Sequence, residues 1–594
     1  MKLSDFVIDW LVRFGVKHVF LLPGGGAMHL NDSVAKNKTL RVVCNLHEQA
    51  SAIAAEAYAQ YTGLGVVMVT TGPGGTNTIT GVAGAWLEST PVLFISGQVK
   101  RSDLRGVRQV RQVGFQEVDI VSLVKSITKY AVTVTSPSDI RACLEEAVWR
   151  ATTGRKGPVW IDLPLDVQAA EVDETQLAPF RIPAVRDNSE EVRQGAARLI
   201  RLLEGARRPV FLLGHGIRNA GAVEKFMTWI EEVKAPVLTT WKALDFLPDE
   251  HPLYIGRPGA VGQRAANFAQ QTADLFVSIG ARLDFGQTAY NHQNFAPRAR
   301  RIVVDIDGSE IAKLEMPLEL GLVCNALDFV NALCQATPLG FSAERPRWMT
   351  RIKEWKRRYP VLRPEYENVQ KGVNNYVFVH ALGQSLHEAD LLVPGSSGAC
   401  SEITCQALPV RKGIRFINTQ GLGSMGFGIP GALGACIASE QKRTICIDGD
   451  GGFAMNVQEL ALVSKLRLPI KFFVLNNGGY GSIKATQRNY FDSRFLATDE
   501  TSGLYLPSIQ GMAQGFDLPY RLIDSHFELP RQIAEVLDFE GPVVVEVMMS
   551  ADQVTQPKVS SHRNPDGTMS TLPMEDMWPF LDRDELSREL LVED

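Results

Sequence analysis

The sequence predicts an α/β protein with three consecutive domains, each built around a parallel sheet. Apolar strand-like runs alternate with amphipathic segments of helix length along the whole chain, which is the pattern of α/β architecture. A chain of 594 residues is also too long for a single hydrophobic core. Finally, the run Gly541-Pro-Val-Val-Val-Glu546 echoes Gly157-Pro-Val-Trp-Ile-Asp162. This internal similarity suggests two copies of one fold on either side of a different domain.

Polar, proline-containing stretches set the predicted domain boundaries. The first domain is expected to cover residues 1–168 and to be followed by a charged linker. The second domain is expected at 190–337, where it opens on an apolar strand. A further polar segment leads into the third domain, at 371–555. Each predicted domain has the size of an ordinary folding unit.

The last segment, residues 556–594, is charged, proline-rich and poorly periodic, with a short helical pattern around 583–591. Such a tail is commonly a loosely attached extension of the folded body. Its apolar residues, among them Met577 and Trp578, indicate instead that it docks on another part of the molecule. The sequence leaves both interpretations open.

Composition excludes several classes of protein. The apolar fraction of 45% and the charged fraction of 21% are those of an ordinary soluble protein, and the net charge of −5 gives no basic field for nucleic acid. The first ten residues resemble an amphipathic helix rather than a signal peptide, and no apolar run reaches about 18 residues, so no membrane span is expected. Eight cysteines without a C-x-x-C pair indicate reduced thiols, a cytoplasmic location and no zinc site.

Two apolar runs in the third domain end in polar residues. Thr444–Ile447 leads into a glycine-rich acidic turn with Asp450, and Ile470–Leu475 leads into a pair of asparagines with Asn477, 27 positions after Asp450. This spacing suits strand, turn, helix and strand, and so places both side chains at the carboxyl ends of neighbouring parallel strands, where α/β sheets bind ligands. Hard oxygen ligands suit Mg²⁺, which takes its remaining ligands from phosphates and water. The pattern predicts a site for a magnesium diphosphate.

This stretch resembles the fingerprint of the thiamine-diphosphate-dependent enzymes, in which Gly-Asp-Gly is followed by about two dozen residues and Asn-Asn. The resemblance implies pyrimidine-binding, central nucleotide-binding-like and diphosphate-binding domains, in that order. It also implies that Asp450, the Asn477 side chain and the Gly479 carbonyl hold the metal. The cofactor-binding residues that it implies in the third domain are Gly398, Gly423, Met425, Gly449, Gly451, Gly452, Tyr480, Gly481 and Ile483.

A second match lies in the first domain. The segment from Asn45 to Tyr58 resembles the acidic-residue segment of the acetohydroxyacid (acetolactate) synthases, and Glu48 stands at the position of its carboxylate. Such a glutamate is usually a solvated carboxylate or a carboxylate at a helix N-terminus. The resemblance implies instead that Glu48 pairs with the pyrimidine ring, so that the cofactor's own nitrogen can take the C2 proton. Two further segments, Val113–Asp119 and Thr70–Asn77, also resemble segments of this family. They imply catalytic roles in the substrate pocket for Phe115 and Gln116 and a cofactor contact for Asn77.

The segment Gln420-Gly-Leu-Gly-Ser-Met-Gly-Phe-Gly-Ile-Pro430 matches the part of the family that keeps the cofactor bent. The resemblance implies that Met425 is the apolar wedge. A methionine is commonly core filler, but the flanking glycines indicate close approach of a ligand to the backbone.

The central domain resembles that of the FAD-binding acetohydroxyacid synthases. Gly214-His-Gly216 follows a strand, a second strand ends before Arg282, and a third leads to Asp305 and Asp307. The resemblance implies that Gly214 and Gly216 form the nucleotide turn, that Arg282 pairs with the flavin diphosphate, and that Asp305 or Asp307 lies near the adenosine. A domain that binds nothing, or binds ADP, is the alternative.

The resemblance implies decarboxylation of a 2-keto acid, with pyruvate as the expected donor, and transfer of the two-carbon unit to a 2-keto acid, ketone or keto-sugar. It also implies a homodimer or homotetramer with shared active sites. Thr486 stands where branched-chain synthases carry a tryptophan, and the glutamine–histidine pair expected before the wedge is absent from 393–402. Acetolactate synthase proper, a plain decarboxylase, a flavin oxidase and a non-catalytic relative remain alternatives. A nicotinamide dehydrogenase is disfavoured, because the turn at Gly214 lacks the third glycine.

Overall fold

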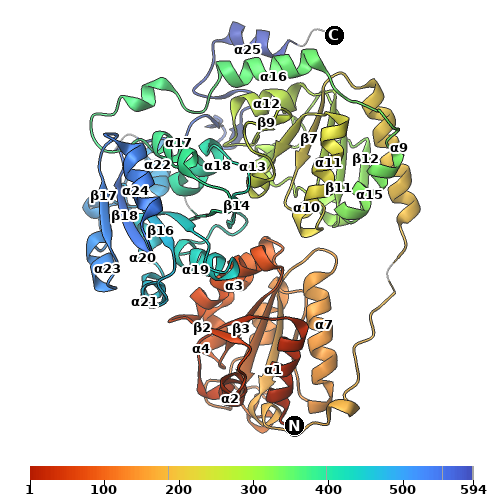
Figure 1. The fold of residues 1–594 in the computed structure, drawn as a ribbon, viewed down its shortest axis with the longest axis vertical. Coiled ribbons are helices and arrows are strands. Elements are labelled where there is room, and N and C mark those ends of the chain that lie inside the picture. The colour runs from red at the N-terminus through yellow and green to blue at the C-terminus, as the bar shows by residue number, and fades with distance from the viewer. Residues whose placement is uncertain (185, 397, 551–552, 592–594) are drawn as a thin grey trace.

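The computed structural model of this chain describes residues 1–184, 186–396, 398–550 and 553–591. Three six-stranded sheets follow one another along the chain, and every neighbouring pair of their strands is parallel. Figure 1 shows the first domain at the bottom, the central domain at the upper right and the third domain at the upper left. The predicted fold class is therefore confirmed. None of the helices in these ranges has the length and apolar character needed to cross a membrane.

The first sheet has the strand order β2-β1-β3-β4-β6-β5. Its helices begin with the amphipathic one expected at the start of the chain. The strands are β1 (His18–Leu21), β2 (Arg41–Cys44), β3 (Gly65–Val69), β4 (Val92–Gln98), β5 (Ala131–Thr133) and β6 (Val159–Pro164). The helices are α1 (Leu3–Phe14), α2 (Met28–Lys36), α3 (Glu48–Thr62), α4 (Pro73–Asn77), α5 (Ile79–Leu87), α6 (Ile120–Val124), α7 (Ile140–Thr152) and α8 (Leu165–Gln168).

The third sheet has the order β14-β13-β15-β16-β18-β17. Counted within each domain, the first and third sheets share the order 2-1-3-4-6-5, which confirms the predicted duplication. The strands are β13 (Leu391–Pro394), β14 (Arg415–Phe416), β15 (Thr444–Gly449), β16 (Ile470–Asn476), β17 (Tyr520–Ile523) and β18 (Val543–Met548). The helices are α17 (Asn375–Ser385), α18 (Thr404–Ala407), α19 (Gly428–Ala438), α20 (Asp450–Ala454), α21 (Leu460–Lys465), α22 (Gly481–Tyr490), α23 (Ile509–Gly515) and α24 (Leu529–Asp538).

The central sheet differs, with the order β12-β11-β10-β7-β8-β9. This is the doubly wound order: successive strands are added to one side of β7 and then, from β10 on, to its other side. The switch between β7 and β10 leaves a crevice for ligands at the carboxyl ends of the strands. The strands are β7 (Pro209–Leu213), β8 (Val237–Thr239), β9 (Tyr254–Gly256), β10 (Leu275–Ile279), β11 (Arg300–Asp305) and β12 (Leu320–Val323). The helices are α9 (Ser189–Gly205), α10 (Gly216–Asn219), α11 (Val223–Val233), α12 (Arg264–Thr272), α13 (Phe285–Thr288), α14 (Gly308–Ala312) and α15 (Ala326–Ala336), followed by α16 (Pro346–Arg358). The domain boundaries drawn from the sequence stay predictions.

Helices α3 and α19 join the first domain to the third, and they lie side by side in Figure 1. Both are rich in alanine and glycine, and nearly all of their residues are buried. At Gly434 of α19 a Cβ atom would overlap the carbonyl oxygen of Ala54 in α3. Small residues therefore allow the two helix backbones to approach closely.

We expect Gly434→Ala to destabilise the protein by about 1–3 kcal/mol, the usual range for overpacking a tight core. The added methyl group meets backbone of α3, which cannot turn aside as a flexible side chain would. Urea unfolding measures the effect. Gly205→Ala is the matched control, because a Cβ atom there meets nothing within 4 Å. Equal midpoints for the two variants would contradict the expected close approach.

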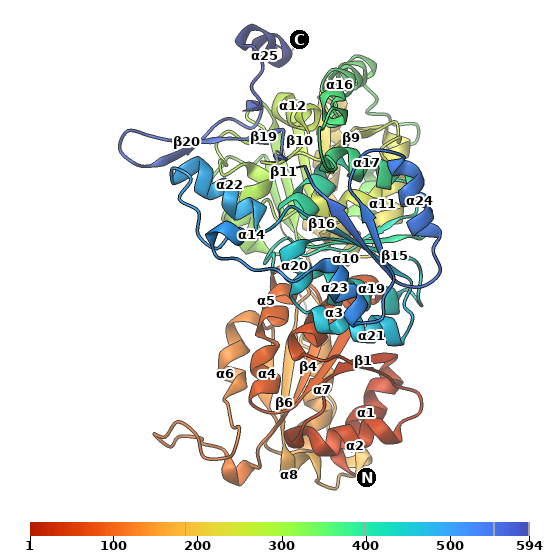
Figure 2. The ribbon, with the colours of Figure 1, turned by 90° about the vertical axis from the view of Figure 1, so that its left-hand side faces the viewer.

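The tail docks on the rest of the molecule, so a loosely attached extension is the wrong interpretation. Its elements are β19 (Lys558–Val559), β20 (Ser561–Arg563), β21 (Met569–Thr571), β22 (Met577–Trp578) and α25 (Arg583–Leu590). Figure 1 shows α25 beside α16, where Glu589 accepts a hydrogen bond of 2.7 Å from Trp355 Nε1 and pairs with Arg358. The hairpin of β20 and β21 projects from the surface (Figure 2).

Candidate active site

The polar turns after β15 and β16 lie side by side, as predicted, because Gly449 pairs with Leu475 in the parallel ladder. Asp450 begins α20 and is only 5% exposed. Its carboxylate accepts hydrogen bonds from the backbone N–H of Gly451 at 2.7 Å and of Gly479 at 2.9 Å. Burial raises the pKa of Asp450 to about 6, although these backbone donors oppose the shift. The carboxylate is thus held between the turn after β15 and the turn after β16.

Two glycines make the second turn possible. Gly479 has φ +142°, and a Cβ atom there would overlap the carbonyl oxygen of Thr498. At Gly481 a Cβ atom would overlap the side chain of Asn477, which is exposed and lies against the start of α22. No three His, Cys, Asp or Glu side chains of the described residues form a group that could hold a metal ion. A metal beside Asp450 therefore needs amide, backbone and cofactor oxygens as further ligands.

Met425 and Tyr480 converge on the glycine turn of α20. A Cβ atom on Gly451 would overlap the Tyr480 ring and lie 3.4 Å from the Met425 methyl carbon. Gly423 has φ +63°, which favours glycine, and the Ser396 hydroxyl donates to the carbonyl of Ser424 at 2.6 Å. Met425 is half-buried rather than enclosed in the core, so core filler is the wrong interpretation.

The remaining cofactor-binding candidates of this domain cluster in the same place. Gly398, with φ +44°, leaves room for the Ser482 hydroxyl, and a Cβ atom there would overlap that oxygen. Gly452 leaves room for the carboxylate of Asp448, while Gly449 has open space around it. Ile483 is exposed on α22. The cofactor-binding residues that the resemblance implies for this domain therefore lie around the starts of α20 and α22.

Glu48 is the first residue of α3 and is 7% exposed, so the solvated carboxylate is the wrong interpretation. Asn77, at the end of α4, donates to its Oε2 at 2.9 Å. The helix N-terminus is capped separately, because the His47 ring accepts from the N–H of Gln49 at 3.1 Å. Glu48 is therefore held by one side-chain donor and keeps acceptor capacity for another partner.

Gln116 has φ +62°, a conformation that is strained for a residue other than glycine. Its carbonyl lies against Gly72, where a Cβ atom would overlap it. A buried polar chain stands behind it: Thr71 donates to Gln98 at 2.8 Å, and Gln98 donates to Asp162 at 3.2 Å. Sequence reasoning missed this chain, although polar residues at the ends of apolar strands were a signal.

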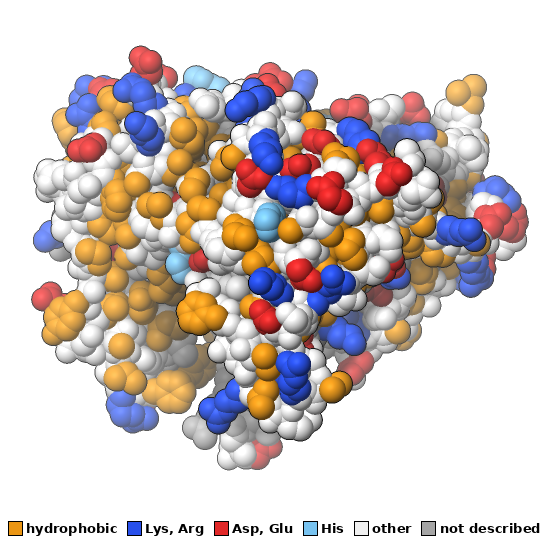
Figure 3. All heavy atoms as spheres, turned by 90° about the horizontal axis from the view of Figure 1, so that it is seen from below, with side chains coloured by type: hydrophobic (Ala, Val, Ile, Leu, Met, Phe, Trp, Pro, Cys, Tyr) orange, Lys and Arg blue, Asp and Glu red, His pale blue; other side chains and the backbone are white. Residues whose placement is uncertain are grey.

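Phe115, beside Gln116, is 85% exposed, and several other large apolar residues are at least half exposed. They include Val107 in the first domain and Tyr490, Leu496 and Tyr505 in the third. Seen from the first-domain end, hydrophobic side chains lie among charged ones over much of the surface (Figure 3). Exposed apolar residues near a site are typical of surfaces that meet another molecule.

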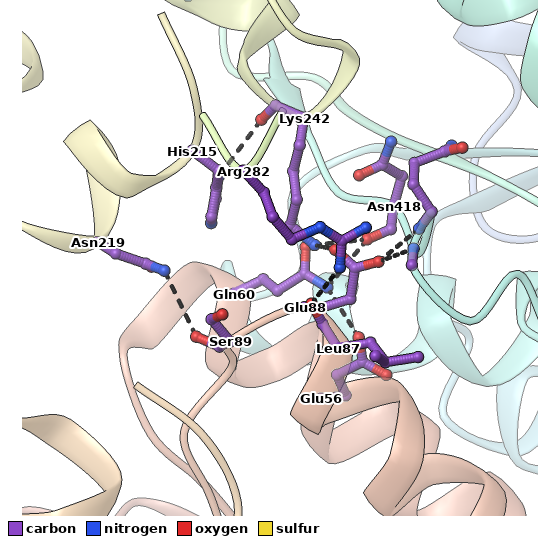
Figure 4. A network of polar contacts seen from close by, with 12 residues as sticks. Glu56, Gln60, Leu87, Glu88, Ser89, His215, Asn219, Lys242, Arg282 and Asn418 are labelled. Carbon is purple, nitrogen blue, oxygen red and sulfur yellow. Dashed lines mark hydrogen bonds and ion pairs between the residues drawn. The ribbon is translucent and has the colours of Figure 1, made fainter. Parts of the chain in front are cut away.

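A cavity of about 840 Å³ lies where the three domains meet. It opens at the carboxyl ends of β7, β10 and β11, and its walls include Gly216, Arg282 and Asp305 from the central domain. Gly214 lies behind this wall, where a Cβ atom would overlap the carbonyl oxygen of Gly280. Burial raises the pKa of Asp305 to about 6. Figure 4 shows Arg282 reaching towards Leu87, whose carbonyl it meets at 3.4 Å.

Three family models match the chain. Residues 1–123 match the "Thiamine pyrophosphate enzyme, N-terminal TPP binding domain", 196–333 match its central domain, and 396–547 match its C-terminal TPP binding domain. Together the three matches fall in the three sheet-forming parts of the chain in the same order.

Similar proteins include the acetolactate synthase isozyme 1 large subunit of Escherichia coli, which is 31% identical over 94% of this chain and 95% of its own. The acetolactate synthase large subunit of Corynebacterium glutamicum is 32% identical over 98% of this chain and 92% of its own. Acetolactate synthase 2 of Zea mays is 30% identical over 94% and 87%. The chain therefore belongs to the thiamine pyrophosphate enzyme family and is a thiamine-pyrophosphate-dependent enzyme of the acetolactate synthase type.

Proposed function

We propose that this enzyme decarboxylates a 2-keto acid, with pyruvate as the donor, and joins the two-carbon unit to a carbonyl acceptor. The observation that carries the proposal is the buried carboxylate of Glu48, fixed by Asn77 and left with a free acceptor position. Its relatives are named acetolactate synthases, and acetolactate is the adduct of such a two-carbon unit with pyruvate. Thiamine diphosphate, when bound, supplies the electron sink for decarboxylation and for formation of the new bond.

Each candidate residue has one task in this proposal. Glu48 accepts a hydrogen bond from the pyrimidine ring and so favours the tautomer that can take a proton. Met425, which lies beside Gly451 and Tyr480, would hold the bent pose of the cofactor. Gln116 and Phe115 face the substrates. The strained backbone of Gln116 supports this role, because such strain is typical of functional sites.

The metal proposed for the acidic turn is Mg²⁺. The Asp450 carboxylate, the Asn477 amide oxygen and the Gly479 carbonyl are hard oxygen donors, and a diphosphate with water would complete an octahedron. The turn's glycines support this fit, since Gly451 has no side chain beside the Tyr480 ring and Gly452 brings a backbone N–H group to the start of α20, where an anion is favoured.

We propose FAD as the ligand of the cavity. Its volume suits a large cofactor, and it lies at the switch point of a doubly wound sheet. Gly214 and Gly216 pack directly against Gly280 at the ends of β7 and β10, and Arg282 in the cavity wall supplies a cation for a diphosphate. ADP alone would leave much of the space unfilled. The test is the absorption spectrum of the purified protein, repeated after denaturation and removal of the released ligand; absence of flavin after reconstitution with FAD would exclude it.

The acceptor is proposed to differ from that of the branched-chain amino-acid synthases. Thr486 lies exposed on α22, three residues after Ile483, where those synthases carry a bulky tryptophan. A smaller side chain leaves room for a larger acceptor, such as a ketone or keto-sugar. The experiment is incubation with pyruvate and a panel of 2-keto acids, aldehydes, ketones and keto-sugars, with products identified by mass spectrometry. Acetaldehyde alone would indicate a decarboxylase, and peroxide a flavin oxidase.

We also propose that the active sites are shared between chains in a homodimer or homotetramer. Glu48 and Asp450 lie in different domains, and the exposed apolar residues around Phe115 and α22 support a partner surface. A cytoplasmic location stays a prediction from the sequence. Sedimentation measures the oligomeric state directly.

A further inference from the structure

A buried carboxylate stands where the three domains meet. Glu88, directly after α5 in the first domain, is 7% exposed. One of its oxygens accepts from the backbone N–H of Gln420 at 2.6 Å and from that of Gly421, both in the third domain. Its other oxygen pairs with the ammonium group of Lys242 in the central domain. Figure 4 shows the Lys242 side chain reaching towards Glu88.

The surroundings of this ion pair are polar but enclosed. The Lys242 ammonium group also donates to the carbonyl of Asn418 at 3.0 Å, and Gln60 donates to the same carbonyl at 3.1 Å. Glu56 lies behind Gln60 and is 1% exposed. The His215 ring lies within hydrogen-bonding distance, 3.3 Å, of the Lys242 carbonyl. Lys242 and Glu88 keep only 13% and 4% of their side-chain surface exposed, and both line the cavity, so the water that still reaches the pair comes from the cavity.

The same residues form part of the cavity wall. Glu88, Lys242, Gln420 and Gly421 all line the cavity for which FAD is proposed. A ligand that fills the cavity would exclude water from the Lys242–Glu88 pair and so strengthen it.

The two residues that Glu88 holds, Gln420 and Gly421, belong to the segment that leads to the proposed thiamine diphosphate site. Gln420 and Gly421 begin the segment that carries Met425 four residues later. The packing leaves little slack, since a Cβ atom on Gly421 would lie 2.9 Å from the Cβ of Leu87. The Gln420 side chain is fixed as well, because it donates to the Ser401 hydroxyl at 2.8 Å. A shift of Glu88 must therefore displace the start of the segment that holds Met425.

We propose that Lys242 and Glu88 are positioning residues that couple the two cofactor sites. A ligand in the cavity fixes the ion pair, and the ion pair fixes the backbone of Gln420 and Gly421, which holds Met425 against bound thiamine diphosphate. The inference rests on the proposed function, since it takes FAD as the cavity ligand. Coupling between two binding sites is reciprocal. If FAD raises the affinity for thiamine diphosphate by some factor, thiamine diphosphate must raise the affinity for FAD by the same factor.

The test uses the full-length protein freed of both cofactors and then titrated. The Kd of thiamine diphosphate is measured at fixed Mg²⁺, by calorimetry or tryptophan fluorescence, without FAD and with saturating FAD. We expect saturating FAD to lower the Kd of thiamine diphosphate by about tenfold, within the usual range of coupling. The coupling ratio is the Kd without FAD divided by the Kd with FAD. Lys242→Met is expected to bring this ratio close to one, whereas Lys242→Arg, which keeps the charge, is expected to retain most of it.

The matched control is Arg443→Met, which breaks an ion pair with Asp390 at 2.7 Å, also little exposed but in the third domain and outside the cavity wall. It is expected to lower stability and leave the coupling ratio unchanged. If Lys242→Met does not fold, Glu88→Gln, which keeps the size of the side chain, tests the same contact.

The outcomes separate the inference from the proposed function. If both cofactors bind the wild-type protein but FAD leaves the Kd of thiamine diphosphate unchanged, the proposed coupling is wrong. The two proposed binding sites are then unaffected. If Lys242→Met weakens both affinities but keeps the ratio, the ion pair is only structural and the inference is overturned. If FAD does not bind at all, the proposed cavity ligand is wrong, and the coupling fails with it.

Discussion

Glu48→Gln is expected to lower the rate of pyruvate consumption by about 10²–10⁴-fold, the usual contribution of acid–base assistance. The amide keeps the size of the side chain and can still accept from Asn77, so the fold should be unaffected. It loses the negative charge that favours the reactive tautomer of the pyrimidine. Single-turnover rates with saturating thiamine diphosphate measure the chemical step without the binding step.

The control for this prediction is Glu56→Gln, on the same helix and more deeply buried, at 1% exposed against 7% for Glu48. Burial raises the pKa of Glu56 to about 8, so its side chain is largely neutral at pH 7. The amide then replaces a neutral acid of the same shape, and the rate is expected to stay within a few fold of wild type. If the two variants lose equal activity, Glu48 has no special role.

Asp450→Asn is expected to weaken Mg²⁺-dependent binding of thiamine diphosphate by at least about 10–100-fold, because a neutral amide is a poorer ligand for a hard cation. The cofactor-free protein should be nearly as stable as wild type. The variant loses the hydrogen bond to Gly479, about 1 kcal/mol, but it also loses the cost of burying a charge. Calorimetric titration and thermal unfolding measure the two effects separately. A large loss of stability in the cofactor-free variant would contradict this account.

The same carboxylate should make cofactor binding depend on pH. The pKa of Asp450 is raised to about 6, mainly by burial, in the absence of metal. A proton competes with the cation below that pH, so the apparent affinity for Mg²⁺ should fall by up to about tenfold for each further pH unit. The sign is opposite for the folding of the cofactor-free protein, where the raised pKa makes the folded state less stable as the pH rises from 3.8 towards about 6.

Mixing Glu48→Gln with Asp450→Asn, at a thiamine diphosphate concentration too low to fill the Asp450→Asn site, separates a shared site from one formed within a chain. In a mixed dimer with shared sites, one site combines both altered residues and the other combines both native ones. After subunits exchange, about a quarter of wild-type activity is then expected. If every site lies within a single chain, the mixture stays inactive.

The sequence predicted those features that local patterns determine. The strands around Asp450 and Asn477 were predicted because each apolar run ends in its own polar turn, and the parallel ladder brings the two turns together. The repeated fold was predicted because corresponding strands kept similar residues. The ion pair of Glu88 with Lys242 was not, since it joins residues 154 positions apart that look ordinary in their own segments. The same is true of the contact between Gln98 and Asp162, which depends on how the strands line up.

The tight contact of α3 with α19 has a consequence for how this chain tolerates change. The two helices occupy corresponding places after the second strand of their domains, so the contact joins like to like across an internal near-symmetry. Their outer ends have diverged: α3 opens with Glu48, while α19 follows the loop that carries Met425. In the proposed function the two related domains therefore carry different parts of one site, Glu48 in the first and Met425 in the third. We therefore expect substitutions to be tolerated least at the small residues where α3 packs against α19. A larger side chain there would strain the first and the third domain together.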